Sequence, residues 1–373
     1  MKVLINTSNL KVGGGVQVAD SICRELYKYT QHTFVIVASD ALKGCANDIK
    51  KYPNIKVVCY NLPSSILSAI SGNDFFLDTL VSKENIDVVL TVFGPSRWVP
   101  KCLHISGFAR SQLVLNDSPY WLTLSLLRRI KAYSRKLVMM YLFRKSTSVF
   151  YTENSYISAK LKRLFPKSRV YTVTNNYNQV FDKPDLWNYS IKLPEFGGLT
   201  LLTISANYPH KNLSIILPTI HYLKKYYPSF KFRFVLTISS EQFLPISNEE
   251  KEHIVFLGPV NINQCPYLYK QSDIMFLPTL LECFSASYAE AMKMKLPILT
   301  TDLNFAKSLC ANAAFYYDAV SPKSLAEAIY KLGNDKCLLN DLIQKGTEQL
   351  LTFDNCEKRV EKLLNILQKE FDI

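Results

Sequence analysis

Short apolar runs alternate with amphipathic stretches along most of this 373-residue chain. The first run is KVLIN at residues 2–6, and residues 16–29 place their apolar side chains on one face of a helix. Strands that alternate with helices through short turns form parallel sheets covered on both faces. The sequence therefore predicts an α/β fold built from doubly wound parallel sheets.

The alternation occurs in two sets. The first set continues with predicted strands at residues 33–38, 55–60, 87–93, 102–106, 148–152 and 169–174, and helices at 75–83, 122–143 and 155–165. The second set has predicted strands at residues 199–205, 232–237, 254–257, 274–277 and 298–300, and helices at 213–226, 266–271 and 286–294. A last amphipathic helix is predicted at residues 357–371.

Residues 175–193 interrupt this pattern and are followed by Pro194 and two adjacent glycines. We therefore predict an N-terminal domain at residues 1–180, a connector at 181–198, a C-terminal domain at 199–355 and a terminal helix at 356–373. Two doubly wound domains in tandem leave a cleft between the carboxyl edges of their sheets. Ligands of such sheets usually bind there.

Composition supports two soluble domains. Apolar residues make up 48% of the chain and charged residues 20%, enough to bury a large core. The longest apolar runs are far below the roughly 20 residues that cross a bilayer, and the chain start lacks the apolar stretch of a signal peptide. The nine cysteines show no metal-binding spacing, which is typical of reduced thiols in a cytosolic protein.

The most informative segment is LLECFSASYAEAM at residues 280–292, directly after an apolar strand. It places Glu282 and Glu290 eight residues apart. If a helix begins near residues 284–286, its free backbone N–H groups form a seat for a diphosphate. Glu282 would then face sugar hydroxyls and Glu290 a ribose diol, which suits a nucleotide sugar. The alternative is a surface helix that happens to carry two acidic residues.

Further segments occur in a recognisable order. They are GGG at residues 13–15, NYNQVF at 176–181, VFLGPV at 255–260, and the E-x7-E segment followed by KLPIL at 295–299. Together they resemble the retaining GT-B glycosyltransferases of family 4, which build bacterial surface polysaccharides. The resemblance implies two Rossmann-like domains facing an interdomain cleft, an acceptor-side N-terminal domain, a C-terminal domain that binds the nucleotide sugar, and a terminal helix that packs back on the N-terminal domain.

The resemblance also implies roles for individual residues. The catalytic residues are Glu282, His104 and Lys211. The donor-binding residues are Gly14, Gly15, Ser205, Asn207, Lys211, Gly258, Val260, Phe284, Ser285 and Glu290. The acceptor side has Gly13 and Arg110. For His104 a core position is the alternative, for Lys211 a solvent-exposed helix end, and for the glycines a tight turn.

The phosphate-binding segment departs from the family pattern. In the family an arginine and a lysine five residues later hold the diphosphate, whereas here Lys211 fits and the arginine position is Ala206. A neutral hydrogen bond from Asn207, charge on His210, or an arginine of the N-terminal domain are the possible replacements. The chain has no D-x-D or H-x-x-x-H motif, so we expect no metal and no cofactor besides the UDP- or GDP-sugar donor.

The net charge of +13 lies entirely in the first half, because residues 1–185 hold 25 basic and 12 acidic residues and the remainder 19 of each. Basic residues gather in the predicted helix 122–143 and just beyond it: Arg128, Arg129, Lys131, Arg135, Lys136, Arg144 and Lys145. A second basic group is Lys160, Lys162, Arg163, Lys167 and Arg169. A basic amphipathic surface attracts anionic lipid headgroups. The alternative is a solvated basic face on a helix packed in the core.

We therefore expect a cytoplasmic glycosyltransferase at the inner face of the cytoplasmic membrane. It would move a hexose to a hydroxyl of a lipid-diphosphate-linked saccharide, in O-antigen or capsule synthesis. No nucleic-acid-binding motif is present, and nucleic acid is not an expected partner. Two alternatives remain: a nucleotide-sugar epimerase of the same architecture, and a non-catalytic sugar-nucleotide-binding subunit of a polysaccharide assembly complex.

Overall fold

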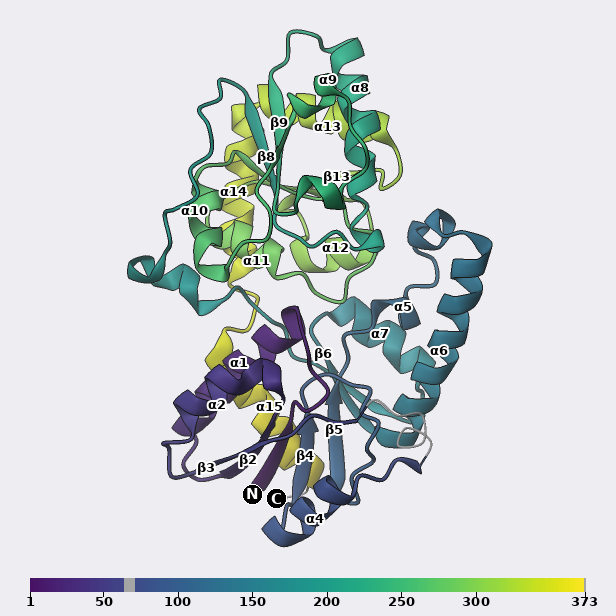
Figure 1. Ribbon diagram of the computed structural model, residues 1–373, viewed down its shortest axis with the longest axis vertical. Helices are drawn as coiled ribbons and strands as arrows, with labels where there is room; N and C mark the ends of the chain where they lie inside the picture. Colours follow the sequence, from purple (N-terminus) through teal and green to yellow (C-terminus); the bar gives the residue numbers. More distant parts are fainter. Residues whose placement is uncertain (64–70, 372–373) are drawn as a thin grey trace. The chain divides into compact units, whose positions relative to one another are not determined.

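The computed structural model describes residues 1–63 and 71–371, and it divides into two compact units (Figure 1). Unit 1 consists of Met1–Asn116, Ser125–Asn175 and Asp354–Ile373. Unit 2 consists of Asn176–Phe353 together with Asp117–Leu124, a segment from within the N-terminal half. The boundary after Asn175 lies five residues before the predicted one, and the predicted connector clusters with unit 2.

In the described part of unit 1, seven parallel strands lie in the order β3-β2-β1-β4-β5-β6-β7. The strands are β1 (Lys2–Asn6), β2 (Thr33–Ala38), β3 (Ile55–Cys59), β4 (Val88–Thr91), β5 (Leu103–Gly107), β6 (Val149–Thr152) and β7 (Arg169–Thr172). The helices are α1 (Gly14–Glu25), α2 (Lys43–Ile49), α4 (Phe75–Glu84), α5 (Ser111–Val114), α6 (Leu126–Ser146), α7 (Ser155–Leu164) and α15 (Cys356–Phe371).

Both faces of this sheet are buried. Along β1, Val3 and Ile5 pack into a cluster that includes α1, α2 and α15, whereas Leu4 packs into a second cluster with Leu77 of α4 and Trp98. Alternate residues of a strand point to opposite faces, so one short apolar run supplies both layers. This is why a continuous apolar run, rather than an alternating one, correctly predicts this strand.

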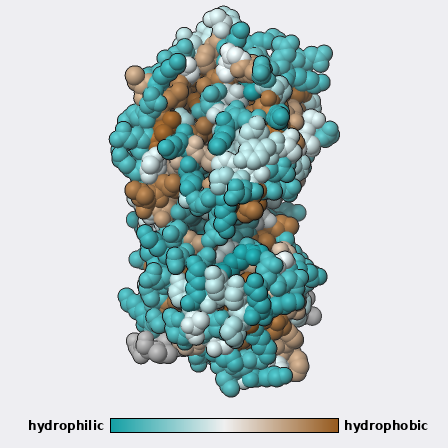
Figure 2. All heavy atoms as spheres, turned by 90° about the vertical axis from the view of Figure 1, so that its left-hand side faces the viewer, coloured by the Kyte–Doolittle hydropathy of each residue, from teal (hydrophilic) through white to brown (hydrophobic). Residues whose placement is uncertain are grey.

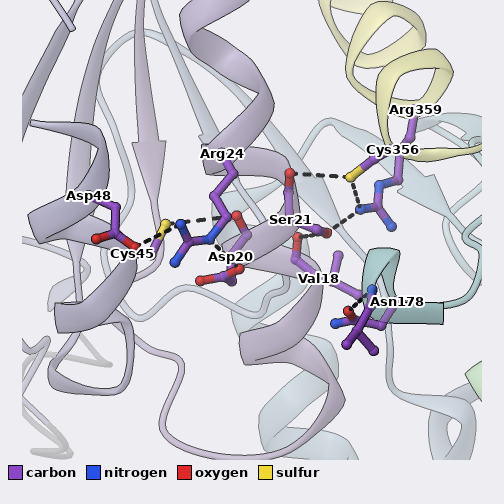
Figure 3. Close-up of polar contacts among 10 residues, drawn as sticks. Val18, Asp20, Ser21, Arg24, Cys45, Asp48, Asn178, Cys356 and Arg359 are labelled. Carbon is purple, nitrogen blue, oxygen red and sulfur yellow. Dashed lines mark hydrogen bonds and ion pairs between the residues drawn. The ribbon is translucent and has the colours of Figure 1, made fainter. Parts of the chain in front are cut away.

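The terminal helix α15 is bonded to α1 at its beginning (Figure 3). The Cys356 thiol donates to the Ser21 carbonyl at 3.2 Å, and the Arg359 guanidinium donates to the Ser21 hydroxyl. Arg359 is buried and also donates to Asn175, which follows β7. These contacts tie the last part of the chain to the first helix of unit 1.

In unit 2, six parallel strands lie in the order β10-β9-β8-β11-β12-β13 within the described residues. The strands are β8 (Leu199–Thr203), β9 (Phe232–Leu236), β10 (Ile254–Phe256), β11 (Ile274–Leu277), β12 (Ile298–Thr301) and β13 (Ala314–Tyr317). The helices are α8 (Ile216–Tyr226), α9 (Asn248–Lys251), α10 (Cys265–Lys270), α11 (Ala286–Lys293), α12 (Asn304–Cys310), α13 (Pro322–Asn334) and α14 (Lys336–Leu350).

The prediction of an α/β fold with doubly wound parallel sheets is confirmed, and the predicted strands agree with the observed ones within two residues at each end. The helix predicted at 122–143 is wrong at its start, because residues 119–123 form a short 3-10 helix and α6 begins at Leu126. No element was predicted for α2, α5 or α9, or for the four elements α12, β13, α13 and α14.

Most apolar side chains are buried in the cores of the two units. The face shown in Figure 2 is mostly hydrophilic, with scattered apolar groups. No helix within residues 1–63 and 71–371 has the length and apolar content required to span a membrane.

Candidate active site

Two loops of unit 2 bring the predicted donor-site residues together. One loop follows β8 and carries Lys211, and the other follows β11 and carries Glu282. β8 and β11 are paired neighbours in the sheet. Because the carboxyl ends of neighbouring parallel strands lie at the same edge, residues about 70 positions apart in sequence meet there.

Lys211 and Glu282 form an ion pair, with Lys211 Nζ donating to Glu282 Oε1. Their side chains are only 15% and 13% exposed, so the pair is partly shielded from water. The hydroxyl of Thr279 lies 3.1 Å from the same carboxylate oxygen. Lys211 is therefore not the solvent-exposed helix-end lysine that was the alternative interpretation.

Backbone bonds hold the two loops against each other. The amide of Leu280 donates to the carbonyl of His210 at 2.7 Å, directly beside Lys211 in the chain. The hydroxyl of Thr301 on β12 donates to the carbonyl of Thr279 at 2.9 Å. The ion pair thus sits on a scaffold fixed by three strands of the sheet.

His210 was one candidate for the charge that the missing arginine would supply. Burial lowers the pKa of its imidazole below the ordinary value of 6.5, with the neighbouring Lys211 acting in the same direction and Glu282 opposing it. The ring stacks on that of Tyr208, with centroids 5.7 Å apart. Among the predicted replacements for an arginine at Ala206, charge on His210 is therefore disfavoured.

The other two residues of the phosphate loop are engaged with unit 2 itself. The amide of Ser205 donates to the hydroxyl of Thr237 at 3.0 Å. The side chain of Asn207 is exposed and donates to the carbonyl of Gln242. Asn207 would have to leave this partner in order to bond a phosphate.

Glu290 lies on α11, where its side chain is buried rather than open to solvent. Tyr269 of α10 donates its hydroxyl to Glu290 Oε2 at 2.9 Å. Burial raises the pKa of Glu290 to about 7, and the bond from Tyr269 opposes that shift. The carboxyl group of Glu290 is therefore fixed by Tyr269 and largely shielded from solvent.

Ser285 is the N-cap residue of α11 and makes no side-chain capping bond, while the ring of Phe284 packs edge-on against Phe353 with centroids 5.7 Å apart.

Elsewhere in unit 2, Gly258 follows β10 with φ of +72° and has no heavy atom within 4 Å of the place a Cβ would take. The neighbouring Val260 is partly exposed. The backbone at Gly258 is therefore open to close approach.

The predicted residues of unit 1 fall into two groups. Gly13 has φ of +82° at the N-cap of α1, and neither it nor Gly14 has a heavy atom within 4 Å of the place a Cβ would take, whereas a Cβ at Gly15 would lie 3.4 Å from the ring of Phe93. Positive φ requires glycine at residue 13. Arg110 is exposed at the N-cap of α5. These glycines and this arginine are accessible.

His104, in contrast, is a buried residue of β5. One ring nitrogen, Nε2, lies 2.8 Å from the Thr91 hydroxyl, and the other bonds the carbonyl of Ser146. Burial lowers the pKa of the imidazole to about 4. With both nitrogens engaged inside unit 1, this geometry favours the core position over a catalytic one, because a strand interior leaves no ring atom for a sugar.

Within the described residues no group of three or more histidine, cysteine or acidic side chains is arranged to hold a metal ion. Independence of a metal remains a prediction. The sequence analysis missed the roles of Tyr269 and Thr279. A Thr directly before the acidic motif was visible in the sequence, but its bond to Glu282 depends on the turn of the loop.

Comparison with known proteins places the segment that carries Lys211, Glu282 and Glu290 in a known family model. Residues 192–349 match the family model of the glycosyl transferases group 1, so Lys211, Glu282 and Glu290 all lie within the matched segment. The chain is 24% identical over 276 residues to the O-antigen chain mannosyltransferase RfbU of Salmonella typhimurium. The aligned region covers 71% of this chain and 72% of that protein.

Two solved structures share the whole fold. WaaG, a glycosyltransferase involved in lipopolysaccharide biosynthesis, superposes with a TM-score of 0.67 and 15% identity over 98% of this chain and 99% of its own. HepE of Anabaena in complex with UDP-glucose has a TM-score of 0.64 and 14% identity over 99% and 100% of the two chains. The chain therefore has the GT-B fold, with a glycosyl transferases group 1 segment in unit 2.

Proposed function

We propose that this protein is a retaining glycosyltransferase of family 4 that moves a hexose from a UDP- or GDP-sugar to a hydroxyl of a lipid-linked glycan in surface polysaccharide synthesis. The observation that carries the proposal is the Lys211–Glu282 pair at the sheet edge of the segment that matches the group 1 model. The similarity to RfbU supports the kind of product, an O-antigen chain.

The ion pair suggests how the donor is recognised. A diphosphate carries more negative charge than one carboxylate, so on donor binding Lys211 exchanges Glu282 for phosphate oxygens. Glu282, released from Lys211 but still close to Thr279, then accepts hydrogen bonds from sugar hydroxyls. Positive charge beside the leaving diphosphate stabilises the charge that develops there.

The remaining donor contacts follow from the positions of the loops. The amides around Phe284 and Ser285, at the start of α11, bind the diphosphate together with Lys211. Glu290 binds the ribose diol once the segment around Tyr269 opens. No metal is required in this proposal, since the lysine and the helix-terminal amides supply the positive potential.

A transfer assay tests the proposal. Incubation with labelled UDP- and GDP-hexoses and a bacterial lipid-linked saccharide extract is expected to give a labelled lipid product. Lys211→Ala and Glu282→Ala are each expected to lower the rate about 100-fold or more. Lys345→Ala and Glu327→Ala are matched controls, because both residues lie in exposed ion pairs of unit 2.

Three results would overturn the proposal. Formation of an epimeric nucleotide sugar from donor alone would identify an epimerase. Wild-type transfer rates in folded Lys211→Ala and Glu282→Ala variants would show that the pair is not catalytic, and nucleotide-sugar binding without any turnover would indicate an assembly subunit.

The partner surface in this proposal is the anionic inner face of the cytoplasmic membrane, bound through α6. An outward stripe on this helix consists of Leu126, Ile130, Tyr133, Leu137 and Tyr141, which recur at helical spacing and are between 50% and 73% exposed. The opposite side of the helix places Leu142 and Phe143 in the core of unit 1. The helix thus presents an apolar face that is not packed in the core, contrary to the alternative interpretation.

Charge complements the outward stripe. The helix contains seven lysines and arginines and no acidic residue. An apolar face flanked by basic residues lies in the headgroup region of a bilayer, where each basic residue contributes about 1 kcal/mol near an anionic surface. Docking of this helix would bring unit 1 to a lipid-linked acceptor.

Vesicle sedimentation tests the membrane partner. Wild-type protein is expected to bind vesicles rich in phosphatidylglycerol and to bind phosphatidylcholine vesicles much less. Ile130→Ser with Leu137→Ser should reduce binding, whereas Phe75→Ser, an exposed apolar residue of α4, is the matched control. Equal binding to both vesicle types would remove the electrostatic role.

A further inference from the structure

A short segment from the N-terminal half belongs to the donor-site unit. Residues Asp117–Leu124, here called the strap, cluster with unit 2 although the chain before and after them belongs to unit 1. Residues 119–123 form a 3-10 helix that begins after Ser118. The strap ends at Leu124, and α6 begins two residues later.

The strap contacts both loops that carry the candidate catalytic residues. The hydroxyl of Ser118 donates to the carbonyl of Leu280 at 2.6 Å, two residues before Glu282. The ring of Tyr120 meets the imidazole of His210 edge-on, with centroids 6.4 Å apart, directly before Lys211. Ser118 and Tyr120 are both buried, as is Leu280.

These contacts link the strap to the ion pair through a series of hydrogen bonds. Leu280 receives a hydrogen bond from Ser118 at its carbonyl and donates its amide to the carbonyl of His210. Lys211, which follows His210, in turn bonds Glu282. A buried carbonyl without a hydrogen-bond donor is destabilised, because it has also lost its bonds to water. When Ser118 cannot donate, we therefore expect the loop of Leu280 to shift.

We propose that the strap is a positioning element of the donor site, with Ser118 as the positioning residue that fixes the loop of Glu282. This inference rests on the proposed function of the Lys211–Glu282 pair and adds a residue to it. Ser118 touches neither reacting group, and it acts through the Leu280 carbonyl. A small displacement of catalytic groups lowers the rate of transfer more than the affinity for the donor.

Ser118 has a second role that the test must separate. Its side chain also accepts a hydrogen bond from the amide of Tyr120 at 3.1 Å and so caps the 3-10 helix. Aspartate at this position can still accept that bond, but as a carboxylate it cannot donate to Leu280. Threonine can do both, and alanine can do neither.

The experiment compares Ser118→Asp, Ser118→Thr and Ser118→Ala in the full chain, by steady-state transfer from the donor that wild type uses. The proposal expects Ser118→Asp and Ser118→Ala to lose about tenfold in kcat with less than threefold change in donor KM, and Ser118→Thr to stay near wild type. Leu122→Ala, whose side chain is largely exposed on the same strap, is the matched control.

Several outcomes decide the question. If Ser118→Asp equals wild type while Ser118→Ala does not, the residue is only a helix cap and the proposal is wrong. If all three variants equal wild type, the strap does not position the loop. If Ser118→Asp does not fold, the comparison of Ser118→Ala with Ser118→Thr still tests the proposal. Equal kcat values in these two folded variants would contradict it. An inactive wild type would instead refute the glycosyltransferase function itself.

Discussion

Two helices of unit 1, α6 and α15, place their apolar side chains in opposite environments. Both are long and mix apolar with charged residues, but α6 has seven basic and no acidic residues whereas α15 has four basic and three acidic ones. The apolar side of α15, including Val360, Leu363 and Leu367, is buried against α1 and the sheet. The outward stripe of α6 is exposed along most of its length. Amphipathic spacing therefore predicts a helix, but it does not tell whether the apolar face meets the protein's own core or a partner.

The polar contacts of the two helices differ in the same way. On α15, Arg359 is buried and lowers the pKa of Glu153, a carboxylate that follows β6. Burial still dominates and raises the pKa of Glu153 to about 7. On α6 the basic residues are mostly exposed. Removal of a buried cation leaves the carboxylate it faces uncompensated within its own unit, whereas exposed cations lie on a surface that a partner can reach.

The largest expected effect of a substitution concerns the buried charge. Arg359→Ala leaves Glu153 without the cation that lowers its pKa and is expected to lower the free energy of unfolding by about 3–5 kcal/mol at pH 8. Urea unfolding followed by circular dichroism measures it.

The effect of Arg359→Ala depends on pH through Glu153. The folded pKa of Glu153 lies above the unfolded value, so wild-type stability itself declines as the pH rises from about 4.5 to about 7. At pH 5 Glu153 is protonated in both folded proteins, and the loss caused by the substitution is smaller than at pH 8. An equal loss at both pH values would show that Arg359 acts through packing alone. The double variant Arg359→Met, Glu153→Gln should recover part of the loss.

The next effect tests the buried apolar face of α15. Leu367 is fully buried, and Leu367→Ala is expected to cost about 2–5 kcal/mol because it removes apolar contacts and leaves a cavity. The same urea experiment measures the loss. A change below about 0.5 kcal/mol would mean that α15 does not depend on this packing.

The smallest effect on stability is expected on α6. Leu137→Ala should change the free energy of unfolding by no more than about 0.5 kcal/mol, because its side chain is half exposed. Its affinity for anionic vesicles should nevertheless fall several-fold, since less apolar surface enters the bilayer. A strong loss of stability with unchanged vesicle binding would reverse the contrast between the two helices.

Sequence reasoning was most accurate where one local pattern decides the structure. The apolar runs predict the strands because burial on both faces of a parallel sheet leaves few other residues possible. Elements between residues 301 and 355 were missed although some local signals were present, such as Ser321 and Pro322 at the start of α13.

The sequence predicts a set of site residues but not the contacts between them. The spacing of Glu282 and Glu290 suggested two roles, yet only the fold shows that Glu282 pairs with Lys211 and that Glu290 is buried beside Tyr269. His104 shows why the sequence does not predict contacts. A histidine in a strand has the same sequence context whether its ring faces a ligand or the core. The strap escaped prediction because its contacts join residues far apart in the sequence, such as Ser118 and Leu280, which are 162 positions apart.

Unit 2 is proposed to bind a nucleoside diphosphate sugar through Lys211. A thermal-shift panel of UDP- and GDP-linked hexoses measures this directly, because a ligand at 100 times its Kd stabilises the folded state by about 2.7 kcal/mol. We predict a rise of several degrees in Tm for wild type with a subset of the panel, and a much smaller rise for Lys211→Ala. No rise with any member, or an equal rise in both proteins, would contradict the account.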